Sequence, residues 1–106
     1  MPFYVITTFD SREKAADVGK NAVEAGFAAC VSMIHGISSI YRWNGKIEES
    51  DEVMCVFKTS DERVAALEEF LRRNHNYEVP EIVAIRMDRV NQEYEKWIRE
   101  SCNEKL

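Results

Sequence analysis

The sequence predicts an α+β fold in which helices cover one face of a four-stranded sheet. Short runs of β-branched and aromatic residues alternate with helical stripes of apolar residues. Asn44-Gly45 lies between two such strand-like runs and predicts a hairpin, because this dipeptide tolerates the positive φ angles of a type I′ turn. A further helical stripe near the C-terminus completes the order β-α-β-β-α-β-α.

Length and composition indicate one domain and exclude several classes of function. A chain of 106 residues fits a single domain, residues 1–106, and buries roughly two-thirds of its unfolded surface. No apolar run approaches the roughly 18 residues that cross a bilayer, and the N-terminus does not resemble a signal peptide. The net charge of −5 and the scattered basic residues argue against nucleic-acid and membrane partners.

The three cysteines indicate a reducing compartment. Cys30, Cys55 and Cys102 are odd in number and far apart, which excludes a disulfide framework and a CxxC metal knuckle. Cys55 lies within an apolar run and is expected in the core, whereas Cys102 has no visible partner. We therefore expect free thiols and a cytoplasmic location.

Local signals place the elements in order. Residues 3–9 predict the first strand, and Asp10 with Glu13 predicts the cap of a helix within residues 11–25. Gly26 ends that helix. Thr59 with Glu62 predicts the cap of the second helix. Residues 81–87 predict the fourth strand. The stripe of the last helix, capped by Asn91, is Tyr94, Trp97, Ile98 and Cys102.

The hairpin, residues 29–59, is long for its domain. Each arm of roughly fourteen residues spans on the order of 45 Å, whereas a compact domain of this size is roughly 33 Å across. The turn places Trp43 opposite Lys46 and Tyr41 opposite Glu48. We expect the tip to extend beyond the domain and to rest on another subunit.

The predicted order is that of the split βαβ, or ferredoxin-like, arrangement, which carries helices on one sheet face only. Residues 53–57 and 82–85 are apolar at consecutive positions, so the second face is apolar as well. Soluble monomers rarely expose a large contiguous apolar surface. The sequence therefore predicts an oligomer that packs through its sheet faces.

Two residues are candidate metal ligands. The imidazole of His75 suits Cu, Zn or Ni, with Glu78 or Glu81 nearby, but a histidine at a helix C-terminus also interacts with the last carbonyls. Cys30 is a soft thiolate ligand for Cu(I), a reactive thiol, or a small buried apolar residue. His35 is interpreted as a surface or packing residue.

The hairpin also carries a candidate ligand cleft. Tyr41 and Trp43 lie on one face of a strand, where they either line a cleft between subunits or anchor the arm on its neighbour. Lys58, Tyr77 and Glu78 are further polar groups expected to converge with them. The acidic residues at 48, 49, 51 and 52 either hold hard cations or form a solvated strand. No enzyme motif is present, so we expect a binding protein rather than an enzyme.

Four segments together resemble the CutA divalent-cation tolerance proteins over nearly the whole chain. They are ACV at 29–31, SIYRWNGKIEE at 39–49, KT at 58–59 and HNYEVPEI at 75–82. The resemblance implies a ferredoxin-like homotrimer, similar to the PII signalling proteins, with a role in tolerance of copper and other divalent metals. It also implies copper ligands at a first-strand cysteine and two adjacent histidines, positions that are Thr7, Asn74 and His75 here.

Two hypotheses for function follow. The first is a trimeric binding or sensing protein that responds to divalent metal ions, with copper as the candidate, through clefts carrying His75, Glu78 and Cys30. The alternative is a PII-like trimer that binds a small molecule, with metal incidental. Its pocket is formed by Tyr41, Trp43, Lys58 and Tyr77.

Overall fold

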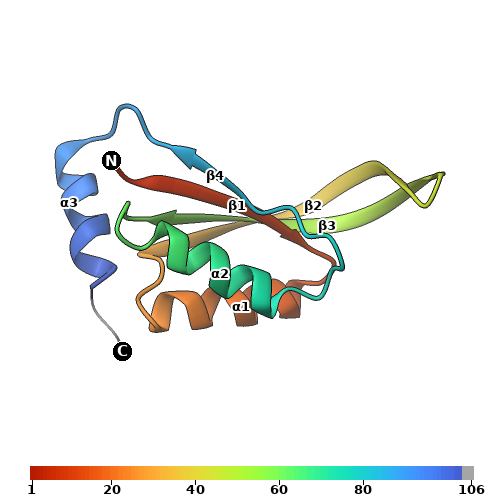
Figure 1. Ribbon diagram of the computed structural model, residues 1–106, viewed down its shortest axis with the longest axis horizontal. Helices are drawn as coiled ribbons and strands as arrows, with labels where there is room; N and C mark the ends of the chain where they lie inside the picture. The colour runs from red at the N-terminus through yellow and green to blue at the C-terminus, as the bar shows by residue number, and fades with distance from the viewer. Residues whose placement is uncertain (104–106) are drawn as a thin grey trace.

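The computed structural model contains one four-stranded antiparallel sheet with the strand order β2-β3-β1-β4, and it describes residues 1–103. Helices α1 and α2 cover one face of this sheet, and α3 lies at one end of it (Figure 1). The order β-α-β-β-α-β-α and the α+β class agree with the prediction. The elements are β1 (Phe3–Phe9), α1 (Arg12–Glu24), β2 (Cys30–Trp43), β3 (Lys46–Thr59), α2 (Val64–Asn74), β4 (Val83–Arg86) and α3 (Gln92–Ser101).

The hairpin of β2 and β3 is as long as the sequence predicts. Each arm has 14 residues, and the turn places Asn44 at φ 51° and Gly45 at φ 77°, as a type I′ turn requires. Trp43 pairs with Lys46 at the tip, as expected. The longest dimension of the molecule is 45 Å, and the hairpin tip extends beyond the helices (Figure 1).

A β-bulge interrupts β2 and decides which side chains share a face. Ile34 pairs with Met54 and Ile37 with Glu52, so β2 has one residue more than β3 between these pairs. Gly36 has φ 75° at this point, a left-handed conformation that favours glycine. Because the extra residue shifts the alternation, residues 37, 39, 41 and 43 lie on the same face as Glu52. The alternation of residues in the sequence did not predict this bulge.

The core lies between the sheet and the two covering helices. Small residues of α1 and the two leucines of α2 pack on alternate residues of β1 and β3. Cys55 is fully buried, as predicted, and burial raises the pKa of its thiol to about 11. The buried members of this cluster are Val5, Phe9, Ala15, Val18, Ala22, Ala28, Val53, Cys55, Phe57, Leu67 and Leu71.

The opposite sheet face, here called the open face, carries apolar side chains without a helix layer, as predicted. Tyr4, Ile34, Val83 and Ile85 are each more than a third exposed there. Pairing of Tyr4 with Ile85 across β1 and β4 places these two on the same face.

Both predicted N-caps of the first two helices are wrong. Ser11, rather than Asp10, caps α1, because its hydroxyl accepts a hydrogen bond from Lys14 N at 3.1 Å. The Asp10 carboxylate instead accepts from Asn76 Nδ2. The hydroxyl of Thr59 is buried and donates to the Phe27 carbonyl at 2.7 Å. A turn separates it from α2, which begins at Val64 without a side-chain cap.

The last strand and helix differ partly from the prediction. β4 has four residues, Val83–Arg86, and is shorter than the predicted 81–87. Asn91 caps α3 as predicted, with its Oδ1 accepting from Glu93 N at 2.9 Å. Ile98 and Cys102 are buried, but Tyr94 and Trp97 stack on each other and remain exposed. The reason is that α3 covers an end of the sheet rather than a face (Figure 1).

Candidate functional site

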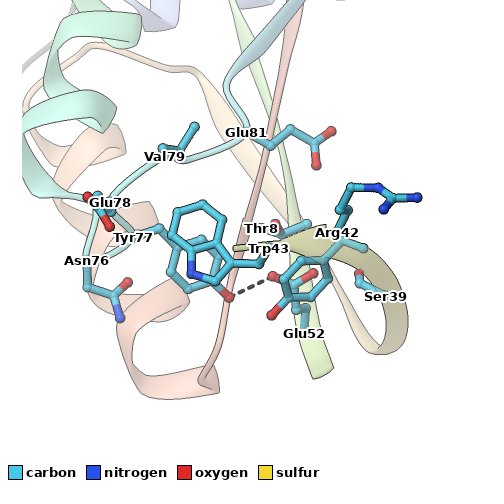
Figure 2. A pocket seen from close by; sticks show the side chains of 11 residues that line it. Thr8, Ser39, Arg42, Trp43, Glu52, Asn76, Tyr77, Glu78, Val79 and Glu81 are labelled. Carbon is cyan, nitrogen blue, oxygen red and sulfur yellow. Dashed lines mark hydrogen bonds between the residues drawn. The ribbon is translucent and has the colours of Figure 1, made fainter. Parts of the chain in front are cut away.

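A cavity of about 610 Å³ lies between the hairpin and the connection from α2 to β4, and we call it the hairpin cavity (Figure 2). Its volume is in the range of small-molecule sites, roughly 300–1,000 Å³. Its lining residues are Thr8, Ser39, Tyr41, Arg42, Trp43, Glu52, Asn76, Tyr77, Glu78, Val79 and Glu81.

Three parts of the fold position these side chains. The bulge at Gly36 turns Tyr41 and Trp43 toward the face that carries Glu52. The α2–β4 connection supplies the lining residues from 76 to 81, and the end of β1 supplies Thr8. The cavity therefore depends on segments that are far apart in the sequence.

Glu52 and Tyr77 form the central polar contact of the hairpin cavity. The Tyr77 hydroxyl donates to Glu52 Oε2 at 2.6 Å (Figure 2). Glu52 is only 9% exposed. Burial and this bond to a carboxylate raise the pKa of Tyr77 well above its usual range, so the phenol stays protonated and keeps donating.

His75 is held by hydrogen bonds at both ring nitrogens. Nδ1 accepts from the backbone N–H of Tyr77 at 3.1 Å, so Nε2 carries the proton and donates to the Thr8 carbonyl at 2.8 Å. The ring also stacks on Phe9, with centroids 4.2 Å apart. Burial lowers the pKa of His75, against smaller opposing effects of Thr8 and Asp10. This neutral imidazole ties the α2–β4 connection to β1.

The structure brings together two of the three positions that the resemblance associates with copper. His75 Nε2 lies 3.1 Å from Thr7 Oγ1, while the Asn74 amide donates to the Phe70 carbonyl at 2.8 Å. Within residues 1–103, no group of three or more His, Cys, Asp or Glu side chains is placed to hold a metal ion.

Cys30 and Lys58 lie together, but at the other end of the sheet. Lys58 Nζ is 3.7 Å from Cys30 Sγ and also contacts Ser32 Oγ. Lys58 pairs with Tyr4 of β1, four residues or roughly 14 Å along the strand from Thr8. Within one chain, the two candidate metal ligands are therefore separated, and Lys58 does not line the hairpin cavity.

The remaining candidates fall into two groups. Tyr41, Trp43, Tyr77 and Glu78 all line the hairpin cavity, so the structure does bring these four together. His35 is exposed beside the bulge, in a smaller hollow of about 210 Å³ that also includes Asp10 and Asp51.

The separate role of Glu52 was not predicted from the sequence. Glu52 appeared as one of four acidic residues on a strand, whereas the structure buries it and pairs it with Tyr77, 25 positions away. The available signal was Gly36, because a glycine inside a strand pattern suggests a bulge, and this bulge brings Tyr41 and Trp43 to the face of Glu52.

The part of the chain that the structure describes contains no helix that is both long and apolar enough to cross a membrane.

This chain matches known proteins both in its sequence and in its fold. The CutA1 divalent ion tolerance protein family matches residues 3–101. The divalent-cation tolerance protein CutA of Thermus thermophilus is 40% identical over 97 residues, which cover 92% of this chain and 94% of that protein. Its solved structure has a TM-score of 0.90 and covers 95% of this chain and 98% of that one.

The human protein CutA is 41% identical over 93 residues, which are 88% of this chain but 52% of the human protein. The chain thus spans about half the length of this relative and nearly the whole of the bacterial one. The match over residues 3–101 includes every strand and helix that the structure describes. The chain belongs to the CutA1 divalent ion tolerance protein family.

Proposed function

We propose that this protein acts in tolerance of divalent cations as a homotrimeric, ferredoxin-like binding and sensing protein in the cytoplasm. The observation that carries this proposal is the family match over residues 3–101. The three free cysteines, Cys30, Cys55 and Cys102, support a reducing compartment. The role is binding rather than catalysis.

Two features support assembly from identical chains. The open face carries exposed apolar side chains on β1, β2 and β4, which association would bury. The hairpin extends beyond the covering helices, so its tip can reach a neighbour (Figure 1). Such an assembly lets side chains of one subunit complete a cation site that a single chain leaves incomplete.

The metal ion proposed first is copper, with His75 and Cys30 as candidate ligands from different subunits and Glu78 nearby. Copper binding at His75 Nε2 requires the ring proton to move from Nε2 to Nδ1, which breaks both the bond to the Thr8 carbonyl and the bond from the Tyr77 backbone N–H. Zinc and nickel are the comparison ions, since imidazole suits all three.

Calorimetric titration of the purified protein with each ion tests this proposal. We expect saturable Cu²⁺ binding with a fixed number of ions per trimer. His75→Ala and Cys30→Ser should each weaken it at least tenfold, whereas His35→Ala, at the exposed histidine, should not. Unchanged affinity in either variant removes that residue from the site. Failure of the native protein to bind any of the ions contradicts the metal proposal.

A gain-of-function variant provides a second test of the metal position. Thr7 is already in contact with His75. Thr7→Cys combined with Asn74→His restores the cysteine and histidine pair that the resemblance implies. We expect this variant to bind copper more tightly than the native protein. If the affinity for Cu²⁺ is unchanged, copper does not bind at positions 7, 74 and 75.

The hairpin cavity favours a second candidate, in which the trimer binds a small molecule and metal is incidental. The supporting observation is a cavity of about 610 Å³ with Tyr41, Trp43 and Tyr77 in its lining. Lys58 would join this pocket only from a neighbouring subunit, because it lies at the other end of its own sheet. Native mass spectrometry of the purified trimer distinguishes the candidates, since a retained metabolite without metal supports the second.

A further inference from the structure

We infer that the hairpin cavity binds a small organic cation, an apolar compound carrying a primary ammonium group. This inference rests on the small-molecule candidate and names the class of its ligand. It depends on three properties of the cavity, namely a buried carboxylate, aromatic lining and an excess of negative charge.

Glu52 is the buried carboxylate, with an exposed fraction of 9%. Buried charges in proteins are normally paired, because removing a carboxylate from water is costly. Its hydrogen-bond donor here is the neutral phenol of Tyr77. Among residues 1–103, no Lys, Arg or His forms an ion pair with Glu52. The carboxylate is thus an acceptor suited to an incoming cation.

The neighbouring histidine does not supply the missing charge. His75 Nδ1 accepts the Tyr77 backbone N–H, and an accepting nitrogen carries no proton. The imidazole is therefore neutral, and its other nitrogen donates to the Thr8 carbonyl. Since Tyr77 engages Glu52 at Oε2, the carboxylate retains acceptor positions for an ammonium N–H.

Aromatic side chains make an organic cation a better fit than a bare ion. Tyr41, Trp43 and Tyr77 all line the cavity, and the faces of such rings attract ammonium groups while packing against an apolar body. A hard divalent ion instead binds oxygen ligands and gains nothing from the apolar body of these rings. The cavity provides one buried carboxylate.

The charge that one chain contributes to the lining favours a cationic ligand over an anionic one, and a Lys58 from a neighbouring subunit would still leave the lining negative. Glu52, Glu78 and Glu81 line the cavity together with a single basic residue, Arg42, which leaves an excess of two negative charges. Glu78 and Glu81 are exposed, so they attract a cation toward the cavity, whereas Glu52 binds it inside.

The experiment titrates the purified protein with 2-phenylethylamine and follows binding by calorimetry in an amine-free phosphate buffer. The matched probe is 2-phenylethanol, which has nearly the same shape and no charge. We expect saturable binding of the amine and at least tenfold weaker binding of the alcohol. Equal binding of both probes, or no binding of the amine up to 10 mM (roughly −2.7 kcal/mol in affinity), overturns the inference.

Three variants locate the site. Glu52→Gln should weaken amine binding at least tenfold and leave alcohol binding unchanged, whereas Trp43→Leu should weaken both probes. Glu49→Gln is the control, because this exposed carboxylate on the same strand does not line the cavity. Full affinity in Glu52→Gln contradicts the inference even if the amine binds. Each variant is first shown to retain the native mass and unfolding temperature.

A competition experiment separates this inference from the proposed function. If Mg²⁺ or Cu²⁺ displaces the amine at equimolar concentration, the cavity is a metal site and the inference is wrong. If the amine does not bind but the trimer retains a metal or another metabolite, only the ligand class is wrong. Amine binding that depends on Glu52, with no competition from either ion, supports the inference.

Discussion

At the scale of single residues, the connection between α2 and β4 is held in place by buried polar groups. His75 bonds to both Thr8 and Tyr77, and Tyr77 continues to Glu52. The chain of contacts thus links β1, the connection and β3. Each of these bonds is partly buried. Removing one partner therefore leaves a buried polar group without a hydrogen bond, which lowers the free energy of unfolding.

The first prediction concerns Tyr77. Tyr77→Phe removes the donor of a buried carboxylate and should lower the free energy of unfolding by about 1–3 kcal/mol, measured by urea denaturation. Tyr41→Phe is the matched control, because Tyr41 is 43% exposed, and it should change stability by less than about 0.5 kcal/mol. Equal stability of Tyr77→Phe and the native protein would show that Glu52 does not need this donor.

The second prediction concerns the pH dependence of stability. The folded protein lowers the pKa of His75, so between the folded and unfolded pKa values the unfolded chain binds more protons. This contribution to stability is complete above the unfolded pKa of about 6.5 and is lost as the pH falls through the folded pKa.

Urea denaturation from pH 8 to pH 5 measures this effect. The stability difference between the native protein and His75→Gln should narrow as the pH falls below about 6.5. His35→Gln, at the exposed histidine, should keep the native pH dependence. A stability difference that stays constant or widens toward pH 5 would contradict a neutral imidazole that is hydrogen-bonded at both ring nitrogens.

At the scale of elements, the bulge in β2 is the feature that builds the hairpin cavity. Successive side chains of a strand point to opposite faces. One extra residue therefore moves every following side chain to the other face. Through Gly36, the aromatic residues at 41 and 43 share a face with Glu52. Without the bulge they would lie on the opposite face of the hairpin.

The third prediction tests the bulge by deletion of Gly36. The shortened strand should return Tyr41 and Trp43 to the other face, and the variant should lose ligand binding and assembly while its body still unfolds cooperatively. Gly36→Ala keeps the residue count, costs about 1–2 kcal/mol for the left-handed conformation, and should retain both properties. Light scattering measures assembly and calorimetry measures ligand binding. Full binding by the deletion variant would contradict the role of the bulge in building the cavity.

At the scale of the whole molecule, the two sheet faces have different roles. One is covered by α1 and α2 and forms the core, and the other leaves Tyr4, Val83 and Ile85 exposed. The overhanging hairpin and this open face are the two surfaces that the trimer proposal uses (Figure 1).

The fourth prediction places a charge on the open face. Ile85 is 46% exposed in one chain, so Ile85→Glu should preserve the subunit fold but convert the trimer to monomers at micromolar concentration. Ala16→Glu introduces the same charge at an exposed position of α1 and should remain trimeric. Light scattering gives the mass of each protein. A native protein that scatters as a stable monomer would refute the trimer itself.

Local patterns in the chain predict the order of strands and helices, the long hairpin with its Asn44-Gly45 turn and the apolar second face, while four short motifs identify the family. These features depend on local periodicity and turn chemistry, which neighbouring residues encode. Four of the five expected cleft residues also meet in the structure, since Tyr41, Trp43, Tyr77 and Glu78 line one cavity.

The remaining features of the site arise from long-range contacts in the folded chain. The fold buries Glu52 against Tyr77, engages both nitrogens of His75, and places Lys58 with Cys30 at the far end of the sheet. Apart from the bond between Tyr77 N and His75 Nδ1, these contacts depend on strand register and join residues 25 to 68 positions apart. Local patterns carry no information about such pairings, because a shift of a single residue reverses the face on which every following side chain lies.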